Sequence, residues 1–286
     1  MDILTTPPEV RVWVSERRRR AQRIGLVPTM GCLHAGHLSL VRLARQRAEA
    51  VVLSLFVNPI QFGPGDNLTG YPRDLQGDQR LCREAGVAAL FLPSAEAMYP
   101  AGHSTFVEEV WFSRGLCGDR RPGHFKGVTT IVAKLFNLVQ PDVAVFGQKD
   151  AQQARVIQQM TRDLEFPVEI VLGQTVREAD GLAMSSRNKL LNAAERRQAL
   201  CLSRALDTAA RRLAAGERET AALIAAMRQE ISGAPLARVD YAEIVDNETF
   251  EPVASINRTA LALLAVHVGS TRLIDNALLT PQGHGD

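Results

Sequence analysis

The sequence predicts an α/β protein, with a doubly wound parallel sheet in a larger first domain and a smaller α+β domain after it. From Ile24 onward, short apolar runs alternate with longer segments of helical periodicity, which is typical of a parallel sheet covered by helices on both faces. Beyond about Thr175 the composition changes to alanine- and arginine-rich helical segments followed by strand-like segments. We therefore expect two domains, over residues 1–175 and 176–286.

The elements of the first domain are expected to follow one another in a regular order. Apolar residues recur at helical spacing from Leu40 to Ala48, and the near-continuous apolar run Val51–Val57 is typical of a buried parallel strand. We expect strands at Ile24–Pro28, Val51–Val57, Ala88–Leu92 and Val143–Phe146, with helices from about Gly36 and at Asp74–Glu84, Gly127–Val139 and Ala151–Leu164. Ligands of such folds collect at the carboxyl ends of the strands, so the turns after Pro28, Val57 and Phe146 are where we expect chemistry.

The second domain is expected to combine two helices with two strands. The helices are expected at Ala193–Ala214 and Glu219–Ile231, and the strands at Val239–Val245 and Ala260–Val268. The segment 173–181 is the expected hinge region between the domains.

Composition and charge exclude several classes of protein. Basic and acidic side chains nearly balance, at a formal net charge of +2, so we expect no nucleic-acid partner, and the run Arg17 to Arg20 is expected to be a solvated helix face. No apolar run approaches the roughly 18 residues that a membrane span needs, so no membrane partner is expected either. Because Met1 to Pro8 lacks the pattern of a secretory signal, we expect a cytoplasmic protein.

The cysteines indicate no disulfide framework and no thiolate zinc site. They lie far apart and include no C-x-x-C pair, so we expect reduced thiols that serve as small hydrophobic residues. They are Cys32, Cys82, Cys117 and Cys201.

The most informative motif is P-T-M-G-C-L-H-A-G-H, residues 28–37, where a predicted strand ends and a helix begins. Its two histidines, His34 and His37, are three residues apart and can project from one side of the first helical turn. The free amides of a helix N-terminus favour phosphate, and histidine donors can follow the charge that develops on a transferring phosphoryl group. Gly36 leaves room for the close approach of a nucleotide.

Two other interpretations of these histidines are possible. One is a zinc pair, and the other is a pair of structural histidines bonded to backbone carbonyls. Zinc requires a third protein ligand, and the remaining histidines show no matching pattern.

Two further segments contain groups that suit phosphate. Ala183 to Asn188 contains two hydroxyls and a guanidinium that can hold the oxygens of a leaving pyrophosphate, although a helix cap would also explain its serines. Phe146 to Gln153 contains Lys149, one of only four lysines, as a mobile charge for phosphate. Asp150 in the same segment could cap the following helix.

Neutral amides at the end of the second strand suggest a small polar substrate. Asn58 and Gln61 lie in the stretch F-V-N-P-I-Q-F-G (56–63), and Gln153 on a later helix could join them. Such amides suit a hydroxy acid, whose hydroxyls need donors and acceptors at fixed places, but each amide taken singly could equally be structural.

Seven segments together resemble the pantothenate synthetase family, also called pantoate–β-alanine ligases, over essentially the whole chain. The H-x-G-H arrangement alone resembles the wider nucleotidyltransferase superfamily with its Rossmann-like domain. The seven segments are residues 28–37, 56–63, 71–74, 121–130, 134–153, 177–188 and 271–276.

This resemblance implies a two-step ligation in the pathway of pantothenate biosynthesis. ATP and (R)-pantoate would form pantoyl-adenylate with release of pyrophosphate, and the amine of β-alanine would then displace AMP. The resemblance also implies a homodimer, and Mg²⁺ that enters with ATP.

The resemblance assigns roles to individual residues. It places catalysis on His37, His34, Lys149, Ser185, Ser186 and Arg187. It places ATP contacts on Pro28, Thr29, Met30, Gly31, His34, Gly36, His37, Gly147, Gln148, Lys149, Asp150, Val176, Met184, Ser185, Ser186 and Arg187. It places pantoate contacts on Gln61 and Gln153 and a β-alanine contact on Gln61. Asn58 joins them as a candidate substrate contact from its place in the same amide-bearing stretch, and Asp78 is the best protein candidate for a Mg²⁺ ligand.

Three positions depart from the family's usual pattern. Cys32 stands where a small residue such as alanine is common, Lys126 stands where arginine is frequent, and Gly77 stands where an acidic neighbour of Asp78 often occurs.

Overall fold

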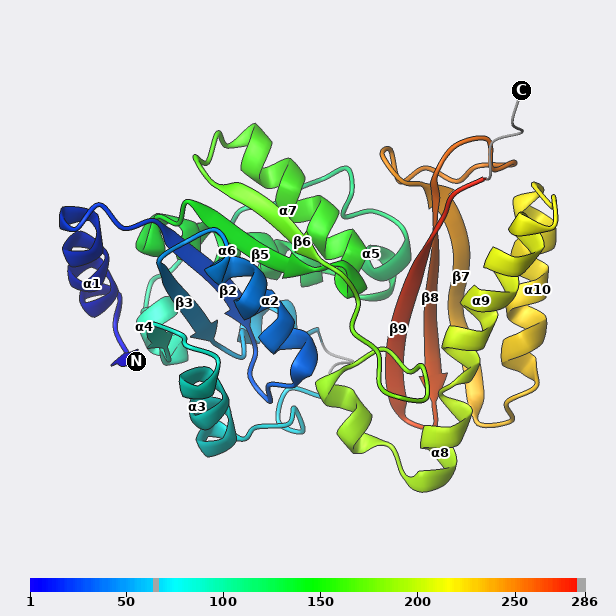
Figure 1. The fold of residues 1–286 in the computed structure, drawn as a ribbon, viewed down its shortest axis with the longest axis horizontal. Helices are drawn as coiled ribbons and strands as arrows, with labels where there is room; N and C mark the ends of the chain where they lie inside the picture. Colours follow the sequence, from blue (N-terminus) through cyan, green and yellow to red (C-terminus); the bar gives the residue numbers. More distant parts are fainter. Residues whose placement is uncertain (64–66, 282–286) are drawn as a thin grey trace. The chain divides into compact units, whose positions relative to one another are not determined.

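The computed structural model describes residues 1–63 and 67–281, and the chain forms two compact units, Met1–Val176 and Arg177–Asp286 (Figure 1). Each unit has hydrophobic clusters of its own. The predicted fold class, a doubly wound parallel sheet with a smaller α+β part, is confirmed.

The first unit is built on a six-stranded parallel sheet with the strand order β1-β4-β3-β2-β5-β6. Its strands are β1 (Asp2–Leu4), β2 (Ile24–Thr29), β3 (Ala50–Leu55), β4 (Ala89–Phe91), β5 (Val143–Gly147) and β6 (Glu169–Gly173). Its helices are α1 (Pro7–Arg19), α2 (Ala35–Arg45), α3 (Leu75–Glu84), α4 (Ala95–Met98), α5 (Leu116–Arg120), α6 (His124–Val139) and α7 (Ala151–Asp163), with short 3₁₀ turns η1 (Pro59–Gln61) and η2 (Gln148–Asp150).

Helices cover both faces of this sheet, as the apolar runs of the strands predict. Successive strand residues point to opposite faces, so Leu26 packs with α1, α6 and α7, while Val27 packs with α2 and α3. On the second face Gly25 brings the sheet close to α2, because a Cβ there would lie 3.4 Å from that of Ala44.

The second unit pairs an antiparallel sheet with two long helices. Its strands β7 (Ala237–Asp246), β8 (Ala260–Val268) and β9 (Thr271–Leu279) lie in sequence order. Its helices are α8 (Ala193–Gln198), α9 (Cys201–Ala214) and α10 (Thr220–Ser232), preceded by the 3₁₀ turn η3 (Ser186–Leu190). One core joins α9 and α10 to the sheet.

The structure corrects the expectation of a single helix over Ala193–Ala214. That segment is divided between α8 and α9, because the carbonyl of Ala199 accepts the N–H of Leu202, three residues on, at 3.2 Å. The carbonyl of Leu200 also accepts the Ser203 hydroxyl at 3.1 Å. Local bonds of this kind compete with the regular helical ladder and favour a break.

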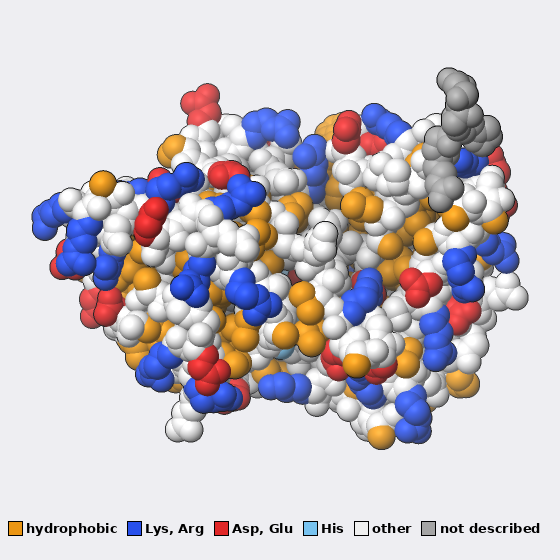
Figure 2. All heavy atoms as spheres, viewed as in Figure 1, with side chains coloured by type: hydrophobic (Ala, Val, Ile, Leu, Met, Phe, Trp, Pro, Cys, Tyr) orange, Lys and Arg blue, Asp and Glu red, His pale blue; other side chains and the backbone are white. Residues whose placement is uncertain are grey.

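In the arginine run at the end of α1, Arg18, Arg19 and Arg20 are exposed as expected, whereas Arg17 is partly buried. Arg17 lies over the ring of Trp13 at 4.8 Å and pairs with Asp2 at 3.3 Å. Arg18 pairs with Asp142 at 2.7 Å and so ties α1 to the turn before β5. Elsewhere on the face drawn in Figure 2, basic and acidic side chains are interspersed. Within the described ranges no helix is long and apolar enough to cross a membrane.

All four cysteines are free and buried, which confirms their predicted use as small hydrophobic residues. Burial raises the pKa of the Cys82 thiol to about 12 and that of Cys201 to about 11. Neither thiol is therefore a ready nucleophile near neutral pH.

Candidate active site

The candidate site of the first unit lies at the point where the connections of the sheet change direction. Strand β2 has β3 on one side and β5 on the other (Figure 1). The pairing of β2 with β5 ends at Leu26 and Ala144, before the strands themselves end at Thr29 and Gly147. A ligand site is expected at such a switch point, beyond the carboxyl ends of the strands.

The turn after β2 is held by a buried carboxylate. Asp78 of α3, which is 2% exposed, accepts the backbone N–H of Cys32 at 2.8 Å and that of Leu33 at 2.6 Å, one on each oxygen. The turn needs this support because Gly31 and Cys32 both have positive φ, of 84° and 52°. A non-glycine residue at positive φ is costly, and fixed contacts must compensate for it.

Thr29 completes the support of the same turn. Its hydroxyl donates to the carbonyl of Ser54 at 2.9 Å and accepts the N–H of Gly31 at 3.3 Å. Thr29 and Asp78 thus fix the path of the chain from β2 to the start of α2.

His34 and His37 lie together at the N-terminus of α2. His34 is the N-cap residue, and its ring centroid lies 4.0 Å from that of His37. The backbone N–H of His34 donates to Nδ1 of His37 at 3.3 Å. Because Nδ1 accepts, the neutral ring carries its proton on Nε2, which is then a donor.

The surroundings of His37 keep this ring neutral. Burial is the main cause, and the positive charges of His34 and Lys149 act in the same direction, lowering the pKa of His37 to about 3. Lys149 lies in η2 after β5, whereas His37 lies in α2 after β2. Their electrostatic interaction therefore links the segments that follow two neighbouring strands. A neutral donor close to the positive charge of Lys149 suits a polyanionic ligand.

The structure does not give Asp150 the capping role that the sequence allowed. Asp150 occupies the N-cap position of α7, but its side chain makes no capping hydrogen bond. The segment Gly147–Asp150 is therefore placed by β5 and the turn η2.

The amides after β3 form a second group, in which Asn58 supports Gln61. Asn58 is 1% exposed, and its Nδ2 donates to Oε1 of Gln61 at 3.1 Å and to the carbonyl of Gly127 at 3.0 Å. Its Oδ1 accepts the hydroxyl of Tyr99 at 2.8 Å. Asn58 thus holds its neighbour in place, and Gln61 also contacts Met30 through Nε2 and the sulfur, at 3.0 Å.

The segment R-P-G-H-F supports Gln61 from the other side. Nδ1 of His124 contacts the carbonyl of Gln61 at 2.9 Å, and Arg121 contacts Nε2 of His124 at 3.0 Å. Since a guanidinium only donates, Nδ1–H is the donor to Gln61. Gly127 lies so close that a Cβ there would meet the Cα of Gln61 at 2.6 Å.

Two other predicted features differ in their surroundings. Gln153 is half-buried on α7, whereas its neighbour Gln152 is buried and donates hydrogen bonds to the carbonyls of Phe112, Arg114 and Gly115.

The ammonium group of Lys126 lies 5.3 Å from the centre of the Phe106 ring and 3.6 Å from the carboxylate of Glu108. These contacts account for a lysine at this position.

The second unit holds the other predicted phosphate-binding segment. Ser185 is the N-cap residue of η3, and its hydroxyl accepts the N–H of Arg187 at 3.3 Å, so the capping alternative for this serine is confirmed. Ser186 is buried, and Arg187 reaches the carbonyl of Arg272 at 3.5 Å.

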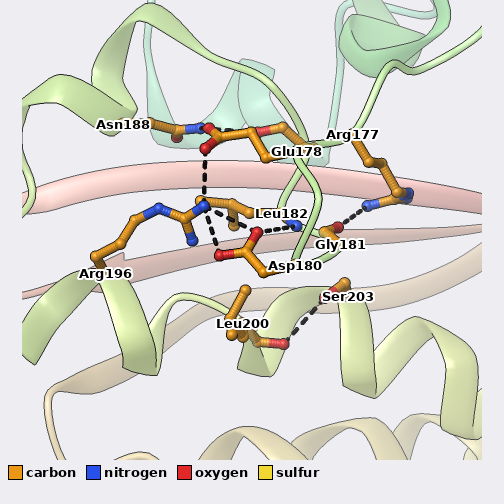
Figure 3. A network of polar contacts seen from close by, with 10 residues as sticks. Arg177, Glu178, Asp180, Gly181, Leu182, Asn188, Arg196, Leu200 and Ser203 are labelled. Atoms are coloured by element: carbon orange, nitrogen blue, oxygen red, sulfur yellow. Dashed lines mark hydrogen bonds and ion pairs between the residues drawn. The ribbon is translucent and has the colours of Figure 1, made fainter.

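A charged residue before this segment binds the sheet of the second unit. Arg177 binds Asp275 of β9 through two hydrogen bonds, of 2.6 and 3.1 Å, which raise the pKa of the guanidinium. Figure 3 shows a neighbouring network in which Arg196 of α8 reaches both Glu178 and Asp180. The stretches 177–188 and 271–276, separate in the sequence, are thus joined by the ion pair of Arg177 with Asp275.

Within the first unit the structure brings His34 and His37 together, with Lys149 acting on His37. It also brings Gln61 to Met30 and surrounds it with supporting residues. Ser185 to Arg187 belong to the second unit, while Val176 ends the first. Nothing in the structure assigns Asp78 to a metal, and the described ranges contain no group of three or more His, Cys, Asp or Glu that could hold one.

Several supporting residues have roles that sequence reasoning did not assign. His124 lies in a stretch that the resemblance includes, but only its contact with Gln61 shows what it does. No local pattern in the sequence indicated that Tyr99 supports the site, because its hydrogen-bond partner Asn58 is 41 residues away.

The comparisons with known proteins agree over the full length. A family model described as pantoate-β-alanine ligase matches residues 2–278. A pantothenate synthetase of Moorella thermoacetica is 55% identical over 279 residues, which cover 98% of this chain and 99% of the relative.

Solved structures are similar as well. The crystal structure of a pantothenate synthetase from Thermus thermophilus matches with a TM-score of 0.94 at 45% identity, covering 98% of this chain and 100% of that one. A pantoate-β-alanine ligase from Francisella tularensis, described as complexed with β,γ ATP and β-alanine, matches with a TM-score of 0.78 at 31% identity, over 97% of each chain. The chain therefore belongs to the pantoate-β-alanine ligase family.

Proposed function

We propose that this protein condenses (R)-pantoate with β-alanine at the expense of ATP, through an enzyme-bound pantoyl-adenylate. The proposal depends most on one observation, the pair His34 and His37 at the N-terminus of α2 beside the β2–β5 switch point. Family membership supports the choice of substrates, as does the relative from Francisella tularensis described with ATP and β-alanine.

In the first step a carboxylate oxygen of pantoate attacks the α-phosphorus of ATP. The bond from that phosphorus to the bridging oxygen of the β-phosphate breaks, and pyrophosphate leaves. We propose that Nε2–H of His37, His34 and Lys149 stabilise the charge that develops on the phosphate oxygens. The turn Pro28 to Gly36 and the segment Gly147 to Asp150 are the proposed nucleotide contacts.

In the second step the amine of β-alanine attacks the acyl carbon of the adenylate. The bond from that carbon to the phosphate oxygen breaks, AMP leaves, and the new amide nitrogen loses a proton. Adenylation is needed because a free carboxylate resists attack by an amine. Gln61 and Gln153 are the proposed contacts of pantoate, and Asn58 is proposed to act through Gln61.

The second unit is proposed to supply Met184 to Arg187 as contacts of the pyrophosphate group. Two hydroxyls and a guanidinium can bind its oxygens with charge-assisted hydrogen bonds. Mg²⁺ is proposed to arrive as the ATP complex, held by phosphate oxygens. Asp78 is a poor candidate ligand, since both of its oxygens accept backbone amides.

The homodimer and the cytoplasmic location are proposed from the family resemblance alone. Sedimentation of the purified protein tests the first, because a monomer at micromolar concentration would contradict it.

Phosphorus NMR with ATP, Mg²⁺ and (R)-pantoate, with and without β-alanine, tests the reaction. We expect AMP and pyrophosphate to accumulate together only when β-alanine is present, because the adenylate is retained until the amine arrives. ADP and phosphate would indicate an acyl-phosphate instead and would overturn the mechanism. Absence of turnover by folded protein would indicate another substrate or a non-catalytic nucleotide sensor.

A further inference from the structure

The segment Ser185–Arg187 lies between a backbone turn, which contains Glu178, and Asn188, which the carboxylate of Glu178 binds. Before it, residues 177–183 form a tight turn, in which the N–H of Glu178 donates to the carbonyl of Leu182 at 2.8 Å and the N–H of Gly181 donates to that of Glu178 at 2.9 Å. Gly181 has φ of 95°, a conformation that favours glycine. The backbone of Glu178 is therefore fixed close to the start of the segment.

One oxygen of Glu178 reaches the far end of the segment. Its Oε1 accepts Nδ2 of Asn188 at 2.6 Å, and the same nitrogen donates to the carbonyl of Ala183 at 3.1 Å. The backbone N–H of Asn188 in turn donates to the carbonyl of Ser185 at 3.0 Å. Asn188 thus closes the loop from Ala183 to its own position, and Glu178 holds Asn188.

The other oxygen of Glu178 connects this loop to helix α8. Its Oε2 accepts Nη2 of Arg196 at 2.8 Å, and Arg196 also pairs with Asp180 at 2.7 Å (Figure 3). Glu178 and Asp180 therefore share one guanidinium, but the contact with Asn188 belongs to Glu178.

We propose that Glu178 is a positioning residue, which fixes the conformation of Ser185–Arg187 through Asn188 and so sets the contacts of that loop with the leaving pyrophosphate. This inference rests on the proposed function for its catalytic consequence. Its structural part, the ordering of the loop, can be measured without any substrate.

A merely structural ion pair would behave differently, and Asp180 supplies the matched control. Glu178→Gln and Asp180→Asn each remove one negative charge beside Arg196, at half-buried or exposed positions, without changing the size of the side chain. Only Glu178→Gln alters the group that accepts the hydrogen bond from Asn188.

The first readout is hydrogen exchange of the free protein at the backbone amides of Arg187, Asn188 and Leu191, which bond within the loop. We expect Glu178→Gln to speed this exchange by about 10- to 100-fold, because the charged acceptor is replaced by an amide whose single oxygen Asn188 must share with Arg196. Asp180→Asn should leave it within about twofold. Equal exchange in the two variants would overturn the proposal.

The second readout is the steady-state rate of pyrophosphate formation. Glu178→Gln should lower kcat by about 10- to 100-fold and leave the KM for pantoate unchanged, whereas Asp180→Asn should have little effect on either. In the double variant Glu178→Gln/Asn188→Ala the two losses should not add, because both residues act through one contact. Additive losses would mean that Glu178 does not act through Asn188.

The two proposals fail in different ways. A wild-type protein that forms no pyrophosphate from ATP, pantoate and β-alanine contradicts the proposed function, and hydrogen exchange then still decides whether Glu178 orders the loop. A wild-type protein that turns over normally, with Glu178→Gln matching Asp180→Asn in both readouts, contradicts the role of Glu178 alone.

Discussion

Nδ1 of His37 accepts the backbone N–H of His34 at 3.3 Å, and this contact leaves Nε2 as the nitrogen that carries the proton. The ring is therefore already oriented as a donor before any nucleotide arrives. It needs no added proton to stabilise negative charge on a phosphate oxygen. The geometry therefore favours hydrogen bonding by the neutral ring over transfer of its proton.

His37 should remain neutral throughout the physiological range in the free protein. Burial, His34 and Lys149 lower its pKa to about 3, so its Hε1 resonance should not titrate between about pH 5 and 8. Because the unfolded chain protonates this histidine near pH 6.5, its stabilising effect is complete above that pH and is lost as the pH falls toward 3.

The measurement is a proton NMR titration, with the resonance assigned by its absence in His37→Gln. Addition of ATP should raise the pKa, because a nearby polyanion favours the imidazolium. A midpoint near 6.5 in the free protein would contradict the assignment of a neutral, buried ring.

Replacing His37 by alanine should greatly lower the rate of adenylation in a protein that still folds. Loss of one donor to a developing charge typically lowers kcat by about 100- to 1,000-fold. Lys149→Ala should act in the same direction. The measurement is pyrophosphate release by each variant, with circular dichroism to check the fold, and normal adenylation by folded His37→Ala would refute this role.

Asp78→Asn should disturb the turn after β2 rather than the binding of Mg²⁺. An amide offers only one oxygen, so one of the N–H groups of Cys32 and Leu33 loses its acceptor, at a cost of about 1–3 kcal/mol in the free energy of unfolding. We expect a lower kcat and an unchanged concentration of Mg²⁺ for half-maximal rate.

Asp74→Asn is the matched control for this change. Asp74 caps the same helix α3 by accepting the N–H of Gly77 at 3.0 Å, but it does not contact the turn. Asparagine also caps helices, so this variant should keep both stability and activity. A much weaker Mg²⁺ response confined to Asp78→Asn would restore the metal-ligand hypothesis.

Gly127→Ala should weaken the binding of pantoate and leave that of ATP intact. The added Cβ would lie 2.6 Å from the Cα of Gln61, and backbone there must shift to relieve the overlap. We expect the KM for pantoate to rise by about tenfold or more, as it should in Gln61→Ala.

Gly233→Ala serves as the control for Gly127→Ala. Its Cβ would meet its nearest neighbour, the carbonyl oxygen of Glu230, at 3.4 Å, an ordinary contact. An unchanged KM for pantoate in Gly127→Ala would show that the position of Gln61 does not govern pantoate binding.

Local patterns in the sequence were sufficient to predict the main elements around the site. The stretch from Ile24 to His37 passes from strand to helix, and its signals, an apolar run, a glycine and a helix start, all lie within a few residues of one another. The structure therefore agrees closely with the expected strand at Ile24–Pro28 and with a helix beginning near Gly36, which begins at Ala35.

Contacts over long sequence distances could not be predicted in the same way. Asp78 meets Leu33 across 45 positions, and only the packing of α3 beside the turn brings the two together. Strand β6 was not predicted, although Ile170, Val171 and Leu172 form a short apolar run, because so short a run does not by itself distinguish a strand from other structure. Strand β9 was also not predicted as a strand, although its T-R-L-I-D-N stretch supported the family resemblance.

The burial of all four cysteines makes the protein a convenient host for site-directed labels. Cys32, Cys82, Cys117 and Cys201 are each shielded from bulk reagents, and two of them have thiols whose pKa is well above neutral. A maleimide probe should therefore react with a newly introduced surface cysteine in preference to these. Fluorophores or spin labels could then be attached without first removing the native cysteines, one in each unit, to follow the protein through its catalytic cycle.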